Sequence, residues 1–319
     1  MSRKILVITG PTAAGKTGLG VRLALELGGE VVSGDSMQVY RGMDVGTAKP
    51  SVAERAGVTH HMLDVAEPEE PYSVARYVAE AGACVEDVLA RGRLPILVGG
   101  TGLYMDSLLL GREFAPGQRA IEADRPYREA LSKRYDLEGG EALWLELREV
   151  DPETAERLHP NDKKRVLRAL EVYQLTGRTM TAHKEETQRV PPRYEAVKIA
   201  MSARERGDLY RRIEARVDAM VAAGLYGEVE GLLRRGLTSE STAMQAIGYK
   251  EMARAVLGEI SLEEAVAEIK QESRRYAKRQ LSWLRRDEAV NWIYWENEPD
   301  FQRAVQVSTE FWRGMADNG

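Results

Sequence analysis

The sequence predicts an α/β protein in which helices cover both faces of a parallel sheet and one helical segment is inserted. Short apolar runs typical of buried strands alternate with stretches of helical periodicity. These runs occupy residues 5–8, 30–35, 94–98 and 197–201. Residues 125–186 are charged and helix-like, without a strand pattern. We therefore expect a core from residues 1–111 and 193–319, with a helical insertion domain at residues 112–192.

The remaining elements follow from local patterns. Leu19, Leu23 and Leu27 lie on one face of the helix expected after the first strand. Residues 36–60 are rich in Gly, Asp and Thr and indicate a long functional loop. The other expected elements are helices at residues 72–91, 204–223, 225–235, 244–257, 261–286 and 299–315, and a short strand at residues 292–295.

Composition limits the possible class of protein. The chain has 319 residues and 43% hydrophobic residues, enough for a sizeable core. No stretch approaches the roughly 18 apolar residues of a membrane span, and Met1–Lys4 leads directly into the first strand, so we expect no signal peptide. The single cysteine, Cys84, rules out an internal disulfide and fits a reducing cytoplasm. Nothing demands a protein partner or more than a monomer.

The segment Gly10–Thr17, GPTAAGKT, has the spacing of a phosphate-binding loop between a strand and a helix. Its glycines allow a tight turn in which backbone N–H groups converge on an anion, and the helix start adds its positive dipole end. Lys16 supplies a full positive charge, and the Thr17 hydroxyl is placed to hold Mg²⁺. This motif predicts a P-loop NTPase-like fold that binds a di- or triphosphate.

Polar residues follow two further strands of the predicted sheet. Asp35 comes after the second strand, and Thr101 follows the strand that ends at residue 98. Because the carboxyl ends of parallel strands meet at one edge, we expect both beside the phosphate loop. Asp35 is suited to hold a metal or accept a proton, or merely to cap a turn. The Gln38 amide can bind the edge of a base, and the alternative is a solvated loop residue. The Thr101 hydroxyl can contact a ligand, and the alternative is a cap of the following helix.

Two basic clusters stand out from a net charge of −5, which by itself gives no general case for nucleic-acid binding. Four basic residues lie between Lys163 and Arg168, and residues 270–286 carry seven basic residues against one acidic. Basic clusters of this kind bind phosphate groups in some proteins, whereas most runs of charged residues form exposed helix faces with salt bridges along them. Tyr276 and Trp283 are interleaved with the second cluster; their spacing favours core packing over base stacking.

The residues alone leave several functions open. No apolar strand after the phosphate loop ends in a convincing acidic residue, because Asp64 is a weak candidate, so an ATP-hydrolysing motor is disfavoured. The four histidines show no metal-binding spacing. A small-molecule kinase with Asp35 at the acceptor site remains, as does a transferase with diphosphate as leaving group. A non-catalytic RNA-binding module is disfavoured, since Lys16, Thr17 and Asp35 are all present.

Six blocks, spread in order over nearly the whole chain, resemble the bacterial tRNA dimethylallyltransferases. They are GPTAAGKT at 10–17, DSMQVYRGMDVGTAKP at 35–50, GGTGLY at 99–104, HPNDKKRVLRALEVY at 159–173, QAIGYKE at 245–251 and RRYAKRQLSWLRR at 274–286. Eukaryotic members of this family carry an added zinc finger. A chain with one cysteine cannot form it, which points to the bacterial form.

The resemblance implies transfer of the dimethylallyl group of dimethylallyl diphosphate to N6 of adenosine 37, in the anticodon stem-loop of tRNA. It implies catalytic roles for Asp35, Thr101 and Lys16, with Mg²⁺ held at Thr17. The implied diphosphate ligands are Gly10, Pro11, Thr12, Ala13, Ala14, Gly15, Lys16 and Thr17. The implied tRNA contacts are Asp35, Ser36, Met37, Gln38, Thr101, Arg128, Lys164, Arg165, Val166, Leu167, Arg168, Gln245, Ala246, Ile247, Gly248, Tyr249 and Lys250. The insertion at residues 112–192 is expected to contact the anticodon loop.

Overall fold

The computed structural model describes residues 3–111 and 125–317, so the expected start of the insertion, residues 112–124, lies outside the described residues. The chain divides into two compact units. The first combines Met1–Leu109 with Arg193–Gly319, and the second is Leu110–Pro192. Each is described below by itself.

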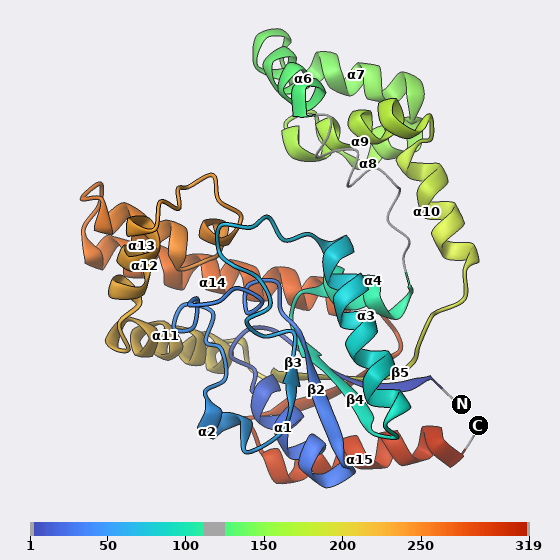
Figure 1. The fold of residues 1–319 in the computed structure, drawn as a ribbon, viewed down its shortest axis with the longest axis vertical. Helices are drawn as coiled ribbons and strands as arrows, with labels where there is room; N and C mark the ends of the chain where they lie inside the picture. Colours follow the sequence, from blue (N-terminus) through green and yellow to red (C-terminus); the bar gives the residue numbers. More distant parts are fainter. Residues whose placement is uncertain (1–2, 112–124, 318–319) are drawn as a thin grey trace. The chain divides into compact units, whose positions relative to one another are not determined.

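The first unit is built on one parallel sheet with the strand order β3-β2-β4-β1-β5-β6 (Figure 1). Its strands are β1 (Lys4–Thr9), β2 (Gly29–Gly34), β3 (His60–His61), β4 (Leu94–Gly99), β5 (Glu195–Ala203) and β6 (Val290–Trp295). Successive side chains of a strand point to opposite faces. Ile5 and Val7 on one face of β1 are as fully buried as Leu6 and Ile8 on the other, so the sheet is covered on both sides, as predicted.

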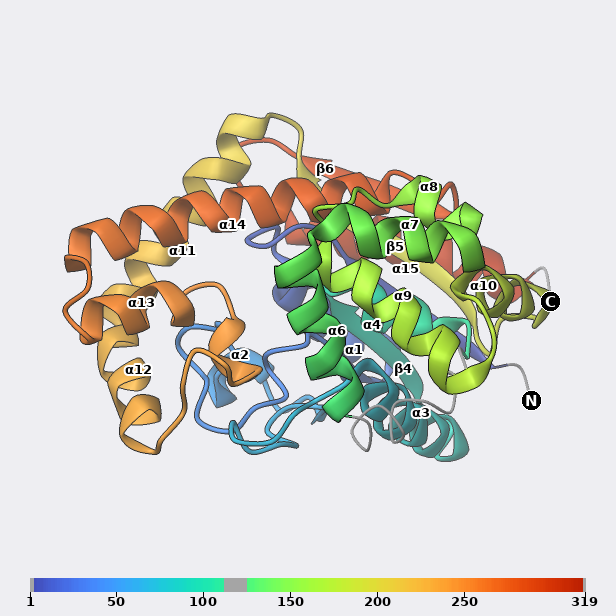
Figure 2. The ribbon, with the colours of Figure 1, turned by 90° about the horizontal axis from the view of Figure 1, so that it is seen from above.

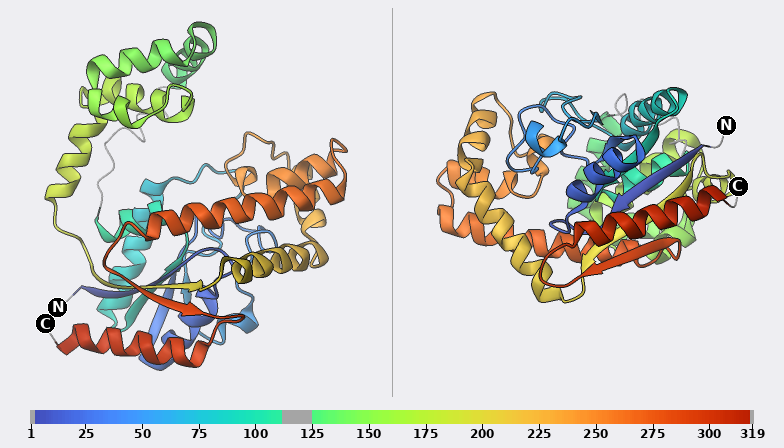
Figure 3. Two further views of the ribbon diagram at one scale, coloured as in Figure 1. Left: turned by 180° about the vertical axis from the view of Figure 1, so that it is seen from behind. Right: turned by 90° about the horizontal axis from the view of Figure 1, so that it is seen from below.

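Helices lie against both faces of this sheet (Figures 2 and 3). The helices of this unit are α1 (Lys16–Leu27), α2 (Val52–Arg55), α3 (Val74–Ala90), α4 (Gly102–Leu109), α11 (Arg206–Ala222), α12 (Leu225–Arg234), the 3-10 turn η1 (Ala243–Gln245), α13 (Tyr249–Val256), α14 (Leu262–Leu284) and α15 (Phe301–Asp317). Helices α1 and α15 pack together over the Leu6 and Ile8 side, while α3 and α4 pack together over the other. The fit is tight, since a Cβ added at Gly20 of α1 would lie 2.6 Å from the Val98 side chain.

Two predicted elements differ from the structure. The helix expected at residues 244–257 is wrong in its first turn, because the chain forms η1, breaks, and starts α13 at Tyr249. The break occurs at Gly248, whose φ of 99° is incompatible with a continuous helix. The loop expected at residues 36–60 contains the short helix α2, whose capping box pairs Ser51 with Glu54.

The carboxyl ends of β1, β2 and β4 meet at one edge of the sheet. Gly34 and Gly99 are register partners, and a Cβ added at Gly99 would lie 2.3 Å from the Gly34 carbonyl oxygen. Only glycine allows the two backbones to pass so closely. The phosphate loop, Asp35 and Thr101 follow directly from these three strands, which confirms the predicted shared edge.

The second unit is helical. Its described helices are α6 (Arg125–Glu138), α7 (Gly140–Val150), α8 (Pro152–Arg157), α9 (Lys163–Thr176) and α10 (Met180–Arg189). It has its own hydrophobic core, to which α6 contributes Leu131, α7 contributes Leu143 and Leu147, and α9 contributes Val166 and Leu170. None of the helices in residues 3–111 and 125–317 combines the length and hydropathy of a membrane span.

Candidate active site

The phosphate loop connects β1 to α1 through backbone conformations that few residues other than glycine adopt. Gly10 has a φ of 139°, and a Cβ there would lie 2.3 Å from the Met201 carbonyl oxygen of β5. Gly15 has a φ of 94° at the start of α1, and Ala13 adopts a left-handed φ of 63°. A non-glycine residue in this region stores strain, which is common where a loop is shaped for a ligand.

Lys16 is the first residue of α1, and its side chain is turned into the loop. Its Nζ donates a hydrogen bond of 2.7 Å to the Pro11 carbonyl oxygen. Burial lowers the pKa of Lys16 to about 7, with Arg216 acting in the same direction and Asp35 opposing it. The site therefore brings two basic groups and one carboxylate close together.

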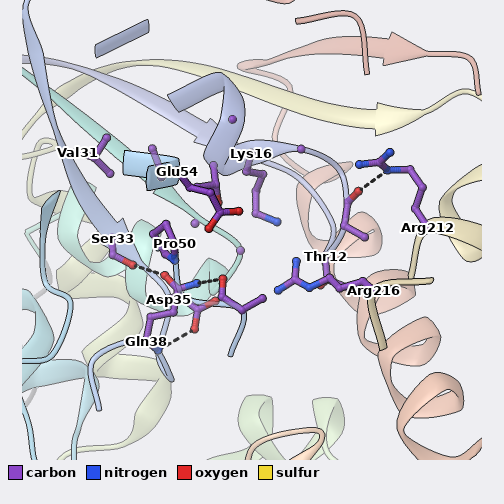
Figure 4. A pocket seen from close by; sticks show the side chains of 18 of the residues that line it. Thr12, Lys16, Val31, Ser33, Asp35, Gln38, Pro50, Glu54, Arg212 and Arg216 are labelled. Carbon is purple, nitrogen blue, oxygen red and sulfur yellow. Dashed lines mark hydrogen bonds between the residues drawn. The ribbon is translucent and has the colours of Figure 1, made fainter. Parts of the chain in front are cut away.

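A cavity of about 550 Å³ opens beside this loop (Figure 4). Thr12, Lys16 and Thr17 line it from the loop and α1, and Asp35 and Arg216 line it from other elements. In Figure 4 the side chains of Lys16, Asp35 and Arg216 point toward the same space. A concave site lined by a phosphate loop, cations and one carboxylate can hold an anionic substrate next to a proton acceptor.

Asp35 adopts the turn geometry that was the alternative to a chemical role, and it still faces the cavity. Its Oδ1 accepts hydrogen bonds from the backbone N–H groups of Met37, at 2.9 Å, and Gln38, at 3.4 Å. These bonds fix the carboxylate and involve only one of its two oxygens. The turn-capping role and the chemical role of Asp35 are therefore compatible, because one oxygen accepts the bonds of the turn and the side chain also lines the cavity.

A second cavity of about 350 Å³ adjoins the first. Thr12, Asp35, Arg216 and Tyr276 line both cavities, so these side chains form their common wall. The rest of the second cavity combines apolar and polar residues. Its apolar lining includes Met37, Ile213, Val217, Met220, Ala246 and Ile247, and its polar lining includes Gln245, Lys250 and Arg279. An aromatic heterocycle needs this kind of mixed surface.

Two side chains that brace the phosphate loop, and a third that lines the cavity beside it, were missed by the sequence analysis. Gln280 of α14 accepts the Thr12 N–H at 2.8 Å and donates to the Gly100 carbonyl oxygen at 2.8 Å, so it ties the loop to the end of β4. Arg212 donates to the Ala13 carbonyl oxygen at 3.1 Å. Arg216 donates to the Thr47 carbonyl oxygen at 3.4 Å. A helical spacing of four residues places both arginines on one face of α11, the signal by which they could have been found.

Two predicted site residues are occupied by bonds within the protein. The Thr101 hydroxyl accepts the Ser36 N–H at 3.1 Å and donates to the Ser36 Oγ at 3.3 Å. The Gln38 side-chain amide donates to the Thr47 and Ala48 carbonyl oxygens and accepts from the Ser33 hydroxyl. Both residues therefore shape the segment around Asp35.

The prediction that Tyr276 and Trp283 are core residues is wrong. Tyr276 lies in the common wall of the two cavities. Trp283 is 41% exposed, covers Gly102 at the start of α4 and donates from Nε1 to Asp106 at 2.9 Å. Their face of α14 lies over the glycine turn after β4, where the absence of a side chain at Gly102 leaves room for Trp283 and its absence at Gly100 leaves room for Gln280.

The chain matches known families over most of its length. The model described as IPP transferase matches residues 38–287, and the model described as isopentenyl transferase matches residues 3–68. A tRNA dimethylallyltransferase of Desulforudis audaxviator is 50% identical over 289 residues, 91% of each chain. One of Geobacillus thermodenitrificans is 49% identical, over 98% of this chain and 96% of the relative. The chain belongs to the tRNA dimethylallyltransferase family.

Solved structures of the family share this fold. The full-length tRNA isopentenylpyrophosphate transferase of Bacillus halodurans has a TM-score of 0.74 at 40% identity, covering 99% of this chain and 98% of that one. A eukaryotic dimethylallyltransferase acting on tRNA has a TM-score of 0.82 at 28% identity, covering 98% of this chain and 80% of that one. The family is an enzyme family, and the small-molecule kinase alternative is not favoured.

The residues for which the family resemblance predicts tRNA contacts fall on both units. On the first unit, residues 35–37 and 245–247 come together around the second cavity with Lys250, although they are about 200 residues apart in the chain. Tyr249 is fully buried, and its hydroxyl donates to Glu228 at 2.6 Å. A contact between Tyr249 and RNA would therefore have to come from its backbone.

On the helical unit, the predicted contacts are the N-terminal half of α9 and Arg128 of α6. Lys164 and Arg165 are exposed, whereas Val166 and Leu167 are buried in the core of this unit. Arg165 is paired with Asp162. Arg128 and Arg168 reach the same buried carboxylate, that of Glu171.

Proposed function

We propose that this chain transfers the dimethylallyl group of dimethylallyl diphosphate to N6 of adenosine 37 of tRNA and releases diphosphate. The observation that carries this proposal is the common wall of the two cavities. Asp35 and Arg216 face the phosphate loop on one side and the second cavity on the other. The proposal assigns the diphosphate to the first cavity and the flipped adenine to the second.

Asp35 is the proposed acceptor of the N6 proton. The lone pair of adenine N6 is delocalised into the ring, so the amine needs a positioned base as it attacks. In the transfer, a bond forms between N6 and C1 of the dimethylallyl group while the bond from C1 to the diphosphate oxygen breaks. The N6 proton passes to Asp35, which the Met37 and Gln38 amides hold in place.

The phosphate loop and its neighbouring cations are the proposed stabilisers of the leaving diphosphate. Negative charge grows on the bridging oxygen as its bond to carbon breaks, and donors already in place lower the energy of that charge. Gly10 to Thr17 supply backbone N–H groups and the start of α1, and Lys16 supplies a proton-bearing amine. Arg216 adds a second cation from α11.

Mg²⁺ is the proposed metal, held by the Thr17 hydroxyl. Residues 3–111 and 125–317 contain no cluster of three His, Cys, Asp or Glu side chains suited to hold a metal. This fits Mg²⁺, which commonly takes one or two protein ligands and completes its shell with substrate phosphates and water. When bound, the ion would neutralise charge on the diphosphate oxygens.

The proposal is tested with an unmodified anticodon stem-loop, dimethylallyl diphosphate and Mg²⁺, followed by mass spectrometry of the RNA. We expect one dimethylallyl group in place of one hydrogen, located at N6 of adenosine 37 by fragmentation, together with one diphosphate released per RNA. A stem-loop with guanosine at position 37 is the control and should remain unmodified. Modification of both stem-loops, or of neither, contradicts the proposal.

A further inference from the structure

A buried carboxylate in the helical unit is unused by the proposed mechanism. Glu171 of α9 is 2% exposed, and both of its side-chain oxygens are buried without a hydrogen bond of good geometry. Two arginines approach it instead. Arg128 Nε of α6 lies 3.2 Å from one oxygen, and Arg168 Nη1, one turn earlier on α9, lies 3.7 Å from the other.

These ion pairs are not expected to add much to the folding stability of the unit. A buried ion pair often contributes no more than apolar residues of the same volume, because removing charges from water offsets their attraction. Glu171 lies on α9 among residues buried in this unit, with Leu167 about one helical turn earlier and Leu170 directly before it in the sequence. A leucine or methionine at position 171 would suit them. The carboxylate therefore calls for another explanation.

The arginines themselves point to one. Their side chains are 54% and 40% exposed, so each guanidinium has one edge against Glu171 and another toward solvent. A guanidinium has five N–H donors in a planar fork, of which the described contact with Glu171 engages one. Two guanidiniums held by one carboxylate carry a net charge of +1 and present further donors side by side.

We propose that Glu171 is a positioning residue that holds Arg128 and Arg168 as a paired site for a phosphodiester group of the tRNA. The inference rests on the proposed function, because it takes tRNA as the ligand. An arginine already held in its bound geometry loses less conformational entropy when it meets a phosphate. Glu171 itself touches no RNA in this proposal and acts through the two arginines.

The decisive variant is Glu171→Gln, because two explanations predict opposite signs for it. It keeps the shape of the side chain and raises the net charge of the protein by one. If overall charge governed binding, the variant would bind an anticodon stem-loop more tightly. If Glu171 positions the arginines, binding weakens by about 10-fold, the loss expected when one charge-assisted hydrogen bond is misplaced.

The matched control is Glu138→Gln. Glu138 lies on α6 of the same unit and pairs with Arg134 at 3.0 Å on the exposed surface. This variant makes the same charge change without altering the Glu171 site. We expect stem-loop affinity within about 2-fold of the unsubstituted protein, or slightly tighter, as for most exposed ion pairs.

Three measurements separate positioning from a loss of fold. For Glu171→Gln, KM for tRNA should rise while kcat and KM for dimethylallyl diphosphate stay unchanged, because the diphosphate site belongs to the other unit. Thermal melting is recorded for each variant. Glu171→Met is included because an apolar residue of similar length should keep the unit folded even if the glutamine variant unfolds, and it should show the same rise in KM.

A mutant cycle completes the test. The variant Arg128→Gln, Arg168→Gln and the triple variant that adds Glu171→Gln should bind the stem-loop almost equally, because Glu171 acts through the two arginines. Unchanged or tighter binding by folded Glu171→Gln, or losses that multiply in the triple variant, overturns the inference. If the unsubstituted protein is inactive on tRNA, the proposed function fails. If it is active and Glu171→Gln behaves like Glu138→Gln, only the positioning role fails.

Discussion

Lys16 is the residue whose charge responds most directly to pH in the proposed site. Burial, together with Arg216, lowers its pKa to about 7. A bound diphosphate favours the protonated amine and raises that pKa. Above pH 7, diphosphate binding therefore requires uptake of a proton, which becomes less favourable as pH rises.

We predict that affinity for dimethylallyl diphosphate falls by up to about tenfold per pH unit above pH 7, the limit for one linked proton. Calorimetry between pH 6 and 9, in buffers of different ionisation enthalpy, measures both the affinity and the proton uptake. Lys16→Arg is the control, because arginine stays charged over this range. Equal pH dependence in the two proteins would assign the titration to another group.

At this scale the sequence predicted what lies in one contiguous motif. Gly10–Thr17 and Asp35 were found because each follows an apolar strand, and strand ends of a parallel sheet must meet. Arg212 and Gln280 were missed because they reach the phosphate loop from helices that lie 199 and 268 residues away in the chain. The four-residue spacing of Arg212 and Arg216 shows that they share a helix face, but it does not show which loop that face approaches.

At the scale of secondary-structure elements, α12 holds residues 44–46 in place through hydrogen bonds to Glu228. The Glu228 carboxylate accepts the backbone N–H groups of Asp44 and Val45, each at 2.8 Å, and of Gly46 at 3.0 Å. It also accepts the Tyr249 hydroxyl of α13. Because Gly46 lines the second cavity, this carboxylate links α12 and α13 to the cavity wall.

We predict that Glu228→Gln destabilises the protein by about 3 kcal/mol, since an amide has one acceptor oxygen where the carboxylate has two. Hydrogen exchange at residues 44–46 should accelerate more than exchange in the sheet, and KM for tRNA should rise. Glu230→Gln, two residues along the same helix, removes an exposed pair with Arg234 and should cost less than about 0.5 kcal/mol. Similar exchange in both variants would contradict the linking role.

Helix and strand positions in the first unit were largely predictable from apolar periodicity, because each element buries one face or both. The failure at residues 244–248 has a local cause. The sequence there has helical periodicity, but Gly248 adopts a φ of 99° and α13 starts only at Tyr249. A glycine in a periodic pattern does not reveal whether its backbone is helical.

For the molecule as a whole, charge balance is the relevant property. The net charge is −5, and several residues of the two basic clusters are paired in the structure, among them Lys163 with Asp136, Arg165 with Asp162 and Arg274 with Glu214. The pair of Arg165 with Asp162 is local, whereas the sequence could not show the other two pairs, because Asp136 and Glu214 lie on other helices, 27 and 60 residues away. Within the described part of the chain, five residues of these clusters have no ion pair: Lys164, Lys278, Arg279, Arg285 and Arg286.

We predict that tRNA affinity still falls with salt. With about five unpaired cations available and a slope near 0.7 for each contact to single-stranded RNA, log Kd against log salt should have a slope of about 3 to 4. Binding of a fluorescent anticodon stem-loop between 50 and 300 mM salt, about a sixfold range on which such a slope is easily resolved, measures it. A slope near zero would remove the role of the basic clusters.

The central claim is that Asp35, in the wall between the two cavities, accepts the proton of the attacking amine. Asp35→Asn tests it most directly, because asparagine retains an oxygen for the Met37 and Gln38 amides and lacks the base. Single-turnover transfer with saturating dimethylallyl diphosphate and tRNA should slow by at least about 100-fold. Dissociation constants for both substrates should stay within a few fold. Transfer by the asparagine variant at the unsubstituted rate would contradict the account.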